Sequence, residues 1–440
     1  MNPKLFFASA LVAVGCSSDP PPMTSAERMD PQACASCHPQ QVAEWSGSMH
    51  AYAADDPAFV AMNARFQREI ATSGSDSSLC VRCHAPLALQ TGATTDGTNL
   101  ASVDAKFHGV TCYVCHSASA VTQTHDDGLT LTDDGVMRGP ISDPAHGASH
   151  GSAYSALHDL NDPSSSSLCG SCHDLQNGHG LDVERTFAEW QSSLYAQNIP
   201  SVSETCSACH MLGSSGVAAT TDGAPQRRVH DHSLAAFDVA LTSFPQASAQ
   251  KTLVQQALNA SIVAKLCVVQ PSGPPNVSIT LDNAFVGHEF PSGAAHDRRV
   301  WVEVHAFASG AEVFSSGTDP TATSDASLWL MRNTLLDASN QPVPFLWQAF
   351  SSSPSTLPPA VTNVTTDPKY IHSVTHTFGP PPETDRVTMI VHARAIGSDV
   401  LDDLVTSGDL DPSVAAAMPT FDLEGTKLEW DKSNGYGCVP

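Results

Sequence analysis

The sequence predicts a multidomain protein, with a mostly irregular and α-helical domain followed by an antiparallel β-sandwich of the Ig-like type. Two observations lead to this prediction. Residues 30–235 are rich in Ser, Gly and Asp, contain no long amphipathic run, and hold ten of the 13 Cys. After Pro271, short alternating stretches are separated by Pro, Gly, Asn and Asp, as in antiparallel sheets.

The N-terminus is typical of an export signal, because the apolar stretch at 5–15 is too short to span a bilayer. The Gly-Cys step that ends this stretch resembles a bacterial lipoprotein signal, in which Cys16 becomes the lipidated first residue. Ala13 stands where such signals usually have Leu, so an ordinary cleaved signal is the alternative. We expect a signal peptide at 1–16 and a flexible tether at 17–29.

The charge is strongly one-sided, with 45 acidic against 20 basic residues and a formal net charge of −25. Nucleic acids and anionic membrane surfaces are bound by clustered Lys and Arg, so neither is an expected partner. An acidic surface can steer basic or neutral partners, or it can simply keep the protein soluble.

Five copies of one motif, Cys-x-x-Cys-His, carry the chemistry. The Cys pairs are Cys34 and Cys37, Cys80 and Cys83, Cys112 and Cys115, Cys169 and Cys172, and Cys206 and Cys209, followed by His38, His84, His116, His173 and His210. This is the attachment signature of haem c: two thiols bond one edge of the porphyrin and the adjacent His binds the iron. The sequence therefore predicts five covalently bound haems in residues 30–235. Zinc ribbons and redox-active disulfides also use Cys-x-x-Cys pairs, but zinc does not need His after every second Cys, and the thioredoxin-like context of redox pairs is missing.

Further His residues are candidates for the sixth, distal iron ligands. His50 ends a short helical stretch after the first motif, His150 precedes the fourth, and His232 follows the fifth. His288 lies in a turn between two predicted strands, from which it could reach a haem of the neighbouring domain. The alternative for each is an ordinary solvent-exposed or turn His. Weaker candidates are His108, His125, His146, His158, His179, His230 and the sulfurs of Met49, Met137 and Met211.

An internal repeat links residues 43–51 to residues 188–196, both of which begin Ala-Glu-Trp. Tyr195 stands in the second copy where His50 stands in the first. Its phenol could form a hydrogen bond, act as a weak iron ligand, or only pack.

Periodicity predicts the elements along the chain. The expected helices are 40–51, 57–71 and 183–195, with a helical connector at 236–270 whose apolar spacing runs over 249–266. The expected strands of a β-sandwich domain at 271–440 include 277–281, 299–305, 374–378 and 386–393. Outside the motifs, Cys267 and Cys438 are expected to form a disulfide in an oxidising compartment, the alternative being two unpaired thiols.

With these residues in view, the chain resembles the multihaem cytochromes of the cytochrome c-554-like superfamily. The resemblance rests on Trp45 to His50, on Cys206 to Met211, and on the Gly-His-x-x-Pro-Ser-Gly turn at 287–293 followed by Arg-Arg-Val-Trp at 298–301. It implies a multihaem electron-transfer protein with an appended sandwich. Related nitrite reductases often have Lys in place of one motif His, and all five motifs here end in His.

Two functions follow as hypotheses. The first is an electron carrier between a quinol-linked or periplasmic donor and an unknown acceptor, exported to the periplasm or held at the outer membrane as a lipoprotein. The second is a haem enzyme in which one open iron acts on a small nitrogen compound such as hydroxylamine or nitrite. The sandwich alone could dock a partner, but docking explains none of the five motifs.

Overall fold

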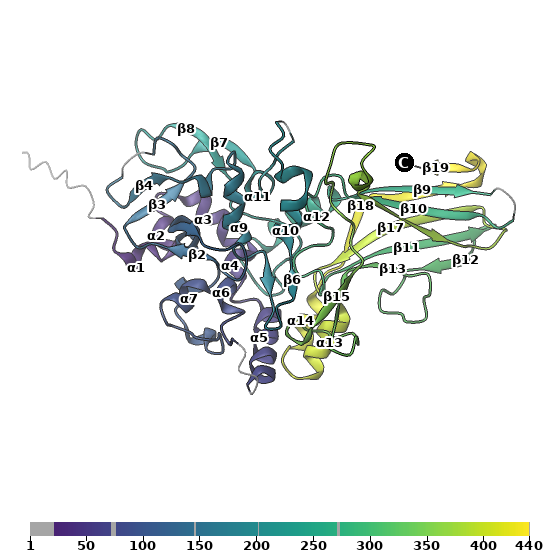
Figure 1. The fold of residues 1–440 in the computed structure, drawn as a ribbon, viewed down its shortest axis with the longest axis horizontal. Coiled ribbons are helices and arrows are strands. Elements are labelled where there is room, and N and C mark those ends of the chain that lie inside the picture. The colour runs from purple at the N-terminus through teal and green to yellow at the C-terminus, as the bar shows by residue number, and fades with distance from the viewer. Residues whose placement is uncertain (1–21, 72–75, 145–146, 201, 271–272, 440) are drawn as a thin grey trace, which may run out of the picture.

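The computed structural model describes residues 22–71, 76–144, 147–200, 202–270 and 273–439 (Figure 1). Its N-terminal part is a set of short helices joined by loops and two-stranded sheets, and its C-terminal part contains the two large sheets. The order of helical part and antiparallel sheets agrees with the sequence prediction. The Ig-like arrangement and the domain limits stay predictions. Among the described residues, no helix has the length and apolar character needed to cross a membrane.

The N-terminal helices are α1 (Ser25–Arg28), α2 (Pro31–Cys34), α3 (Pro39–Ser46), α4 (Met49–Tyr52), α5 (Pro57–Ile70), α6 (Val81–His84), α7 (Pro86–Gln90), α8 (Cys112–His116), α9 (Ser166–Gly170), α10 (Thr186–Ser192) and α11 (Cys206–His210). The small strand pairs are β1 (Ala118–Val121) with β2 (Leu129–Leu131), β3 (Val136–Gly139) with β4 (Gly151–Tyr154), β5 (Leu175–Gln176) with β6 (Asp182–Glu184), and β7 (Gly213–Val217) with β8 (Gln226–His230).

Three predictions in this part need correction. The helix expected at 183–195 is reduced to α10, because residues 182–184 form strand β6 and α10 ends at Ser192. The helix expected at 40–51 is divided into α3 and α4, because Gly47 ends the first and the Ser48 side chain caps the second by accepting from the Ala51 N–H. The tether expected at 17–29 is not free over its described residues. Residues 25–28 form α1, and Arg28 pairs with Asp133 at 2.6 Å.

Helix α5 begins with Asp56 as its N-cap, which accepts the Ala58 N–H at 2.9 Å. Burial raises the pKa of this carboxyl to about 6, whereas the pKa of an Asp in an unfolded chain is about 4. The unfolded chain therefore loses this proton at a lower pH than the folded chain does. As a result, the free energy of unfolding falls by up to about 3 kcal/mol as the pH rises from about 4 to about 6. We expect Asp56→Asn, which keeps the cap, to flatten this part of the pH dependence in urea unfolding. An unchanged slope in the variant would contradict the assignment.

The C-terminal part holds two antiparallel sheets that share one apolar core. One has the order β16-β10-β9-β19 and the other β12-β11-β17-β18, with β13 paired to β11. The strands are β9 (Val263–Val269), β10 (Asn276–Asp282), β11 (Arg299–Ala308), β12 (Ala311–Ser316), β13 (Trp329–Met331), β16 (Ser373–Phe378), β17 (Arg386–Arg394), β18 (Phe421–Asp431) and β19 (Gly437–Val439). A separate pair joins β14 (Asn333–Leu336) to β15 (Ser351–Pro354). Leu266 and Ile279 of the first sheet and Val302 and Val391 of the second are completely buried in this core.

Helix α12 (Ala247–Asn259) is shorter than the sequence predicted, because residues 263–269 form strand β9. The apolar spacing at 253, 257, 262 and 266 fits a helix, but burial from residue 263 onward alternates with the period of two that belongs to a strand. The connector expected at 236–270 therefore contains a central strand of the first sheet.

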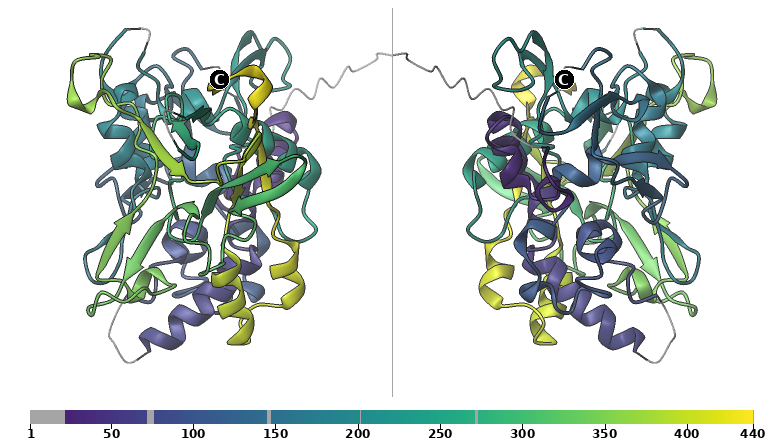
Figure 2. Two further views of the ribbon diagram at one scale, coloured as in Figure 1. Left: turned by 90° about the vertical axis from the view of Figure 1, so that its right-hand side faces the viewer. Right: turned by 90° about the vertical axis from the view of Figure 1, so that its left-hand side faces the viewer.

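The two parts meet along α5. Helices α13 (Ser398–Thr406) and α14 (Pro412–Ala417) lie at the end of α5, as both views of Figure 2 show. Arg68 of α5 makes a two-pronged ion pair with Asp409, with a shorter contact of 2.5 Å. This contact joins the helical part to the segment between α13 and α14.

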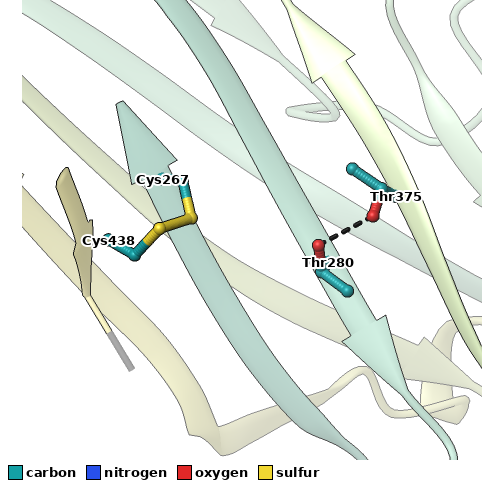
Figure 3. Close-up of a disulfide and its surroundings, with 4 residues drawn as sticks. All are labelled: Cys267, Thr280, Thr375 and Cys438. Atoms are coloured by element: carbon teal, nitrogen blue, oxygen red, sulfur yellow. Dashed lines mark hydrogen bonds between the residues drawn. A yellow bond between two sulfur atoms is a disulfide. The ribbon is translucent and has the colours of Figure 1, made fainter. Parts of the chain in front are cut away.

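Cys267 and Cys438 are joined by a disulfide between directly opposed residues of β9 and β19 (Figure 3). It ties the last described strand to the first strand of the sheets, across 171 residues of sequence. On the other side of β10, the hydroxyls of Thr280 and Thr375 form a hydrogen bond of 2.8 Å in the same sheet.

Candidate functional site

All five Cys-x-x-Cys-His motifs lie on or beside a short helical turn. In the first, second and fourth motifs the His N–H donates to the carbonyl of the first Cys, at 2.8 Å for His38, 3.2 Å for His84 and 3.0 Å for His173. The third and fifth motifs coincide with α8 and α11. One helical turn therefore places the first thiol and the imidazole on the same face, as attachment to a single porphyrin requires.

Most of the imidazoles are oriented by their own backbone surroundings. In seven of them Nδ1 donates to a backbone carbonyl, which leaves Nε2 available for a metal. The motif imidazoles bonded in this way are His38 to Ala218 at 2.7 Å, His84 to Ala53 at 3.0 Å, His116 to Arg138 at 2.5 Å and His210 to Ala235 at 3.4 Å. The others are His150 to Gly151 at 2.9 Å, His232 to His230 at 2.9 Å and His288 to Glu289 at 2.8 Å.

Three of the four predicted distal His face a motif His at a separation that suits an iron. An iron bound to two imidazoles by bonds of about 2 Å separates their ring centres by roughly 6 Å. The ring centres are 6.3 Å apart for His38 and His150, 6.1 Å for His50 and His173, and 6.4 Å for His116 and His232. The residues present therefore fit a haem at the first, third and fourth motifs.

His288 is the fourth predicted distal ligand, and it comes from the turn after β10. Of the cationic groups that lower the pKa of its imidazole, His210 has the largest effect. Burial lowers the pKa of His288 to about 4, as it does for His50 and His173, and that of His116 to about 3. These imidazoles are neutral at neutral pH, which is the form that binds a metal.

His84, in the second motif, has different surroundings. The ring of Phe59 stacks on the imidazole of His84, with the ring centres 4.1 Å apart and an angle of 3° between the ring planes. Among the described residues no imidazole faces His84. Sequence reasoning missed Phe59, because nothing in its helical spacing separates it from the other core residues of α5.

The weaker candidates lie elsewhere. His108 uses both ring nitrogens, on Asp55 and on the Val103 carbonyl, and His179 stacks on Phe350. His158 lies 5.6 Å from His116, and its Nε2 donates to the Cys115 carbonyl while its buried Nδ1 has no hydrogen-bond partner in the described structure. His125 pairs with the adjacent Asp126, and the carbonyl of His230 accepts the hydrogen bond from His232. Met49 belongs to α4, Met137 to β3 and Met211 to the end of α11, while His146 lies outside the described residues.

The motifs lie close to one another. Thiols of neighbouring motifs are near enough to change each other's pKa. The thiol of Cys34 raises the pKa of Cys112, that of Cys172 raises the pKa of Cys83, and that of Cys206 raises the pKa of Cys169. Charge interactions also join Cys115 to Cys172. The contacts connect the motifs in the order first, third, fourth, with the second and fifth motifs both attached to the fourth.

The state of the motif thiols bears on the two alternative uses of Cys-x-x-Cys pairs. The motif cysteines form no disulfide in the described structure, and no group of three or more His, Cys, Asp and Glu converges there as a metal site. Burial raises the pKa of Cys80 to about 12 and that of Cys115 and Cys209 to about 11. The neighbouring thiol of Cys112 lowers the pKa of Cys34, and that of Cys169 lowers the pKa of Cys206. Redox-active pairs also have a thiol whose pKa is lowered, so the thiol pKa values alone do not separate haem attachment from redox use.

Side-chain packing is thin where the motifs gather. The apolar cores of the helical part are small clusters, such as the one formed by Leu87, Tyr113 and Val114, whereas the sheets share a large one. The helical part thus lacks the side-chain core that the sheets have, as expected where prosthetic groups fill the interior.

Comparison with known proteins agrees with this geometry. Residues 33–117, which contain the first three motifs, match the family described as "Cytochrome c554 and c-prime". The chain is a multihaem c-type cytochrome. The cytochrome also shares its fold with a penta-haem cytochrome c552 from Thermochromatium tepidum, at a TM-score of 0.64 and 18% identity, over 92% of this chain and 99% of that one. None of the curated proteins compared with the cytochrome matches it significantly.

Proposed function

We propose that this cytochrome carries electrons through five haems c, one bound by each Cys-x-x-Cys-His motif. The observation that carries the proposal is the contact of every motif with at least one other, from the first through the third to the fourth, with the second and fifth beside the fourth. Neighbouring motifs bring their porphyrins together, and electron transfer between redox groups requires such proximity. Haem supplies the one-electron chemistry.

The chain's own residues then set the properties of each iron. The motif His and a second imidazole are the proposed axial pair, namely His38 with His150, His173 with His50, His116 with His232 and His210 with His288. Backbone carbonyls fix the tautomer of most of these imidazoles, and burial keeps several of them neutral. Two neutral imidazoles leave no open position for a substrate on those irons.

The proposal includes export. Residues 1–16 are proposed as a signal peptide with Cys16 lipidated, which would tether the protein to a membrane in the periplasm or at the outer membrane. These residues, and the first part of the proposed tether, lie outside the described residues. Redox proteins are the proposed partners, a quinol-linked or periplasmic donor and an acceptor of the same class.

Stopped-flow reduction of the haem-loaded protein tests the carrier function. We expect all five haems to reduce and reoxidise with a single small electron donor and acceptor, with transfer among haems faster than delivery. A haem that stays oxidised while the others cycle would contradict a connected chain.

A second function, a haem enzyme with one open iron, is favoured by a specific observation. His84 has the ring of Phe59 beside it and no facing imidazole among the described residues. We expect the EPR spectrum of the ferric protein to show a high-spin signal from about one haem in five, which shifts with cyanide, nitrite or hydroxylamine. Five low-spin signals that ignore these ligands would exclude the enzyme and leave the carrier intact.

A further inference from the structure

The two copies of the Ala-Glu-Trp repeat hold equivalent positions around two motifs. The indole N–H of Trp45 donates to the Val110 carbonyl at 2.8 Å, and that of Trp190 to the Glu204 carbonyl at 2.9 Å. Both acceptors stand two residues before the first Cys of a motif, the third motif for Val110 and the fifth for Glu204. Each copy therefore forms a hydrogen bond to the backbone directly before one motif.

The Glu of each copy holds a second segment. Glu44 accepts the backbone N–H of His232 at 3.0 Å, and Glu189 accepts the backbone N–H of Glu289 at 3.1 Å. His232 is the proposed distal ligand of the third motif, and Glu289 adjoins His288, that of the fifth. The same residue type thus binds the backbone of a distal ligand segment in both copies.

The copies differ at four of their nine positions, and one of these places Tyr195 where the first copy has His50. His50 faces a motif imidazole, whereas the hydroxyl of Tyr195, in the 3-10 turn Leu194–Ala196, donates to the Ala284 carbonyl at 2.8 Å. Of the three roles considered for Tyr195, the structure shows the hydrogen bond. Ala284 lies on the other side of His288 from Glu289, so the second copy holds this loop at both flanks.

We propose that Glu189 and Tyr195 are positioning residues that clamp the loop at 283–292 and thereby hold His288 against the haem of the fifth motif. Glu189 reaches the loop a second time through the Ser292 hydroxyl, at 2.5 Å. The loop is tied on its sheet side as well, because the Asn283 amide donates to the His288 carbonyl at 2.8 Å and Phe290 pairs with Leu357. This inference rests on the proposed axial role of His288.

Spectroscopy of the haem-loaded full chain tests the clamp. We expect the double variant Glu189→Ala/Tyr195→Phe to gain high-spin EPR intensity equivalent to as much as one haem in five, and added imidazole to abolish it. Glu189→Gln should keep the wild-type spectrum, because the amide oxygen still accepts both hydrogen bonds. Burial raises the pKa of Glu189 to about 7, so a neutral side chain resembles the native one. Tyr154→Phe, which removes a hydroxyl bonded to Asp159 outside the loop, is the matched control.

The outcomes distinguish failure of the proposed clamp from failure of the proposed axial role of His288. If His288→Ala gains high-spin intensity and the double variant has the wild-type spectrum, the clamp is wrong and the ligand assignment stands. If His288→Ala itself leaves the spectrum unchanged, the proposed axial role fails, and the clamp with it. A double variant that only unfolds at lower temperature, with an unchanged spectrum below that temperature, has a structural role and also contradicts the proposal.

Discussion

A chain with Cys112 and Cys115 both replaced by serine is expected to lose one haem of five and to lose electron exchange between the first motif and the fourth. The third motif is the described link between them, since Cys112 contacts Cys34 and Cys115 interacts with Cys172. Haem content per chain and stopped-flow reduction measure the two effects. We expect two kinetic groups, one with the haem of the first motif alone and one with the three others.

The matched control is the pair Cys206→Ser and Cys209→Ser, which also removes one haem. The fifth motif is joined to the others through Cys169 alone among the thiol contacts, so its loss leaves the path from the first motif to the fourth in place. The control should show four haems in one kinetic group. If both variants lose one haem and both reduce in one phase, the third motif does not bridge the chain.

Of the substitutions considered for this protein, replacing Cys267 and Cys438 by serine is expected to lower the free energy of unfolding the most. The disulfide closes a loop of 171 residues, and the chain-entropy relation gives a stabilisation of about 5 kcal/mol for a loop of this length. Urea unfolding followed by tryptophan fluorescence measures the effect, because Trp430 and Trp329 lie in the sheets. A serine pair avoids adding reductant, which would also reduce the haems.

Thr280→Val/Thr375→Val is the control for this prediction. It removes a cross-strand hydrogen bond from the same sheet without opening the covalent loop, and such a pair contributes about 0.2–1 kcal/mol. A serine variant that loses no more stability than this control would show that the disulfide does not stabilise the native state.

The sequence was most informative where chemistry fixes the spacing. The thiols and motif imidazoles follow from Cys-x-x-Cys-His alone, because one helical turn determines their geometry. The partner of each imidazole could not be derived, since His150 and His38 are separated by more than 100 residues and meet only in the folded chain. The local sequence around His50, His150, His232 and His288 was enough to predict them as distal ligands. The fold was needed to show which motif each of them could serve.

The remaining differences have local causes. Periodicity could not separate helix from strand around residue 263, because the apolar positions 253, 257, 262 and 266 follow a helical spacing, whereas burial from residue 263 onward alternates as in a strand. The capping residues at Gly47 and Ser48 were visible in the sequence and explain the break between α3 and α4. The Glu44 and Glu189 contacts were signalled by the internal repeat, although a repeat alone does not show which backbone each carboxylate holds.

The position of His288 has a consequence for biogenesis. The fifth motif ends at residue 210, and the residue proposed to complete its coordination follows 78 positions later, in a loop anchored to the sheets. Chains emerge and fold from the N-terminus, so the thiols of the fifth motif are available for haem attachment before that loop exists in its native place. On the proposed assignment, coordination of the haem at the fifth motif is completed only when the sheets have formed, and a prematurely terminated chain would keep that iron exposed.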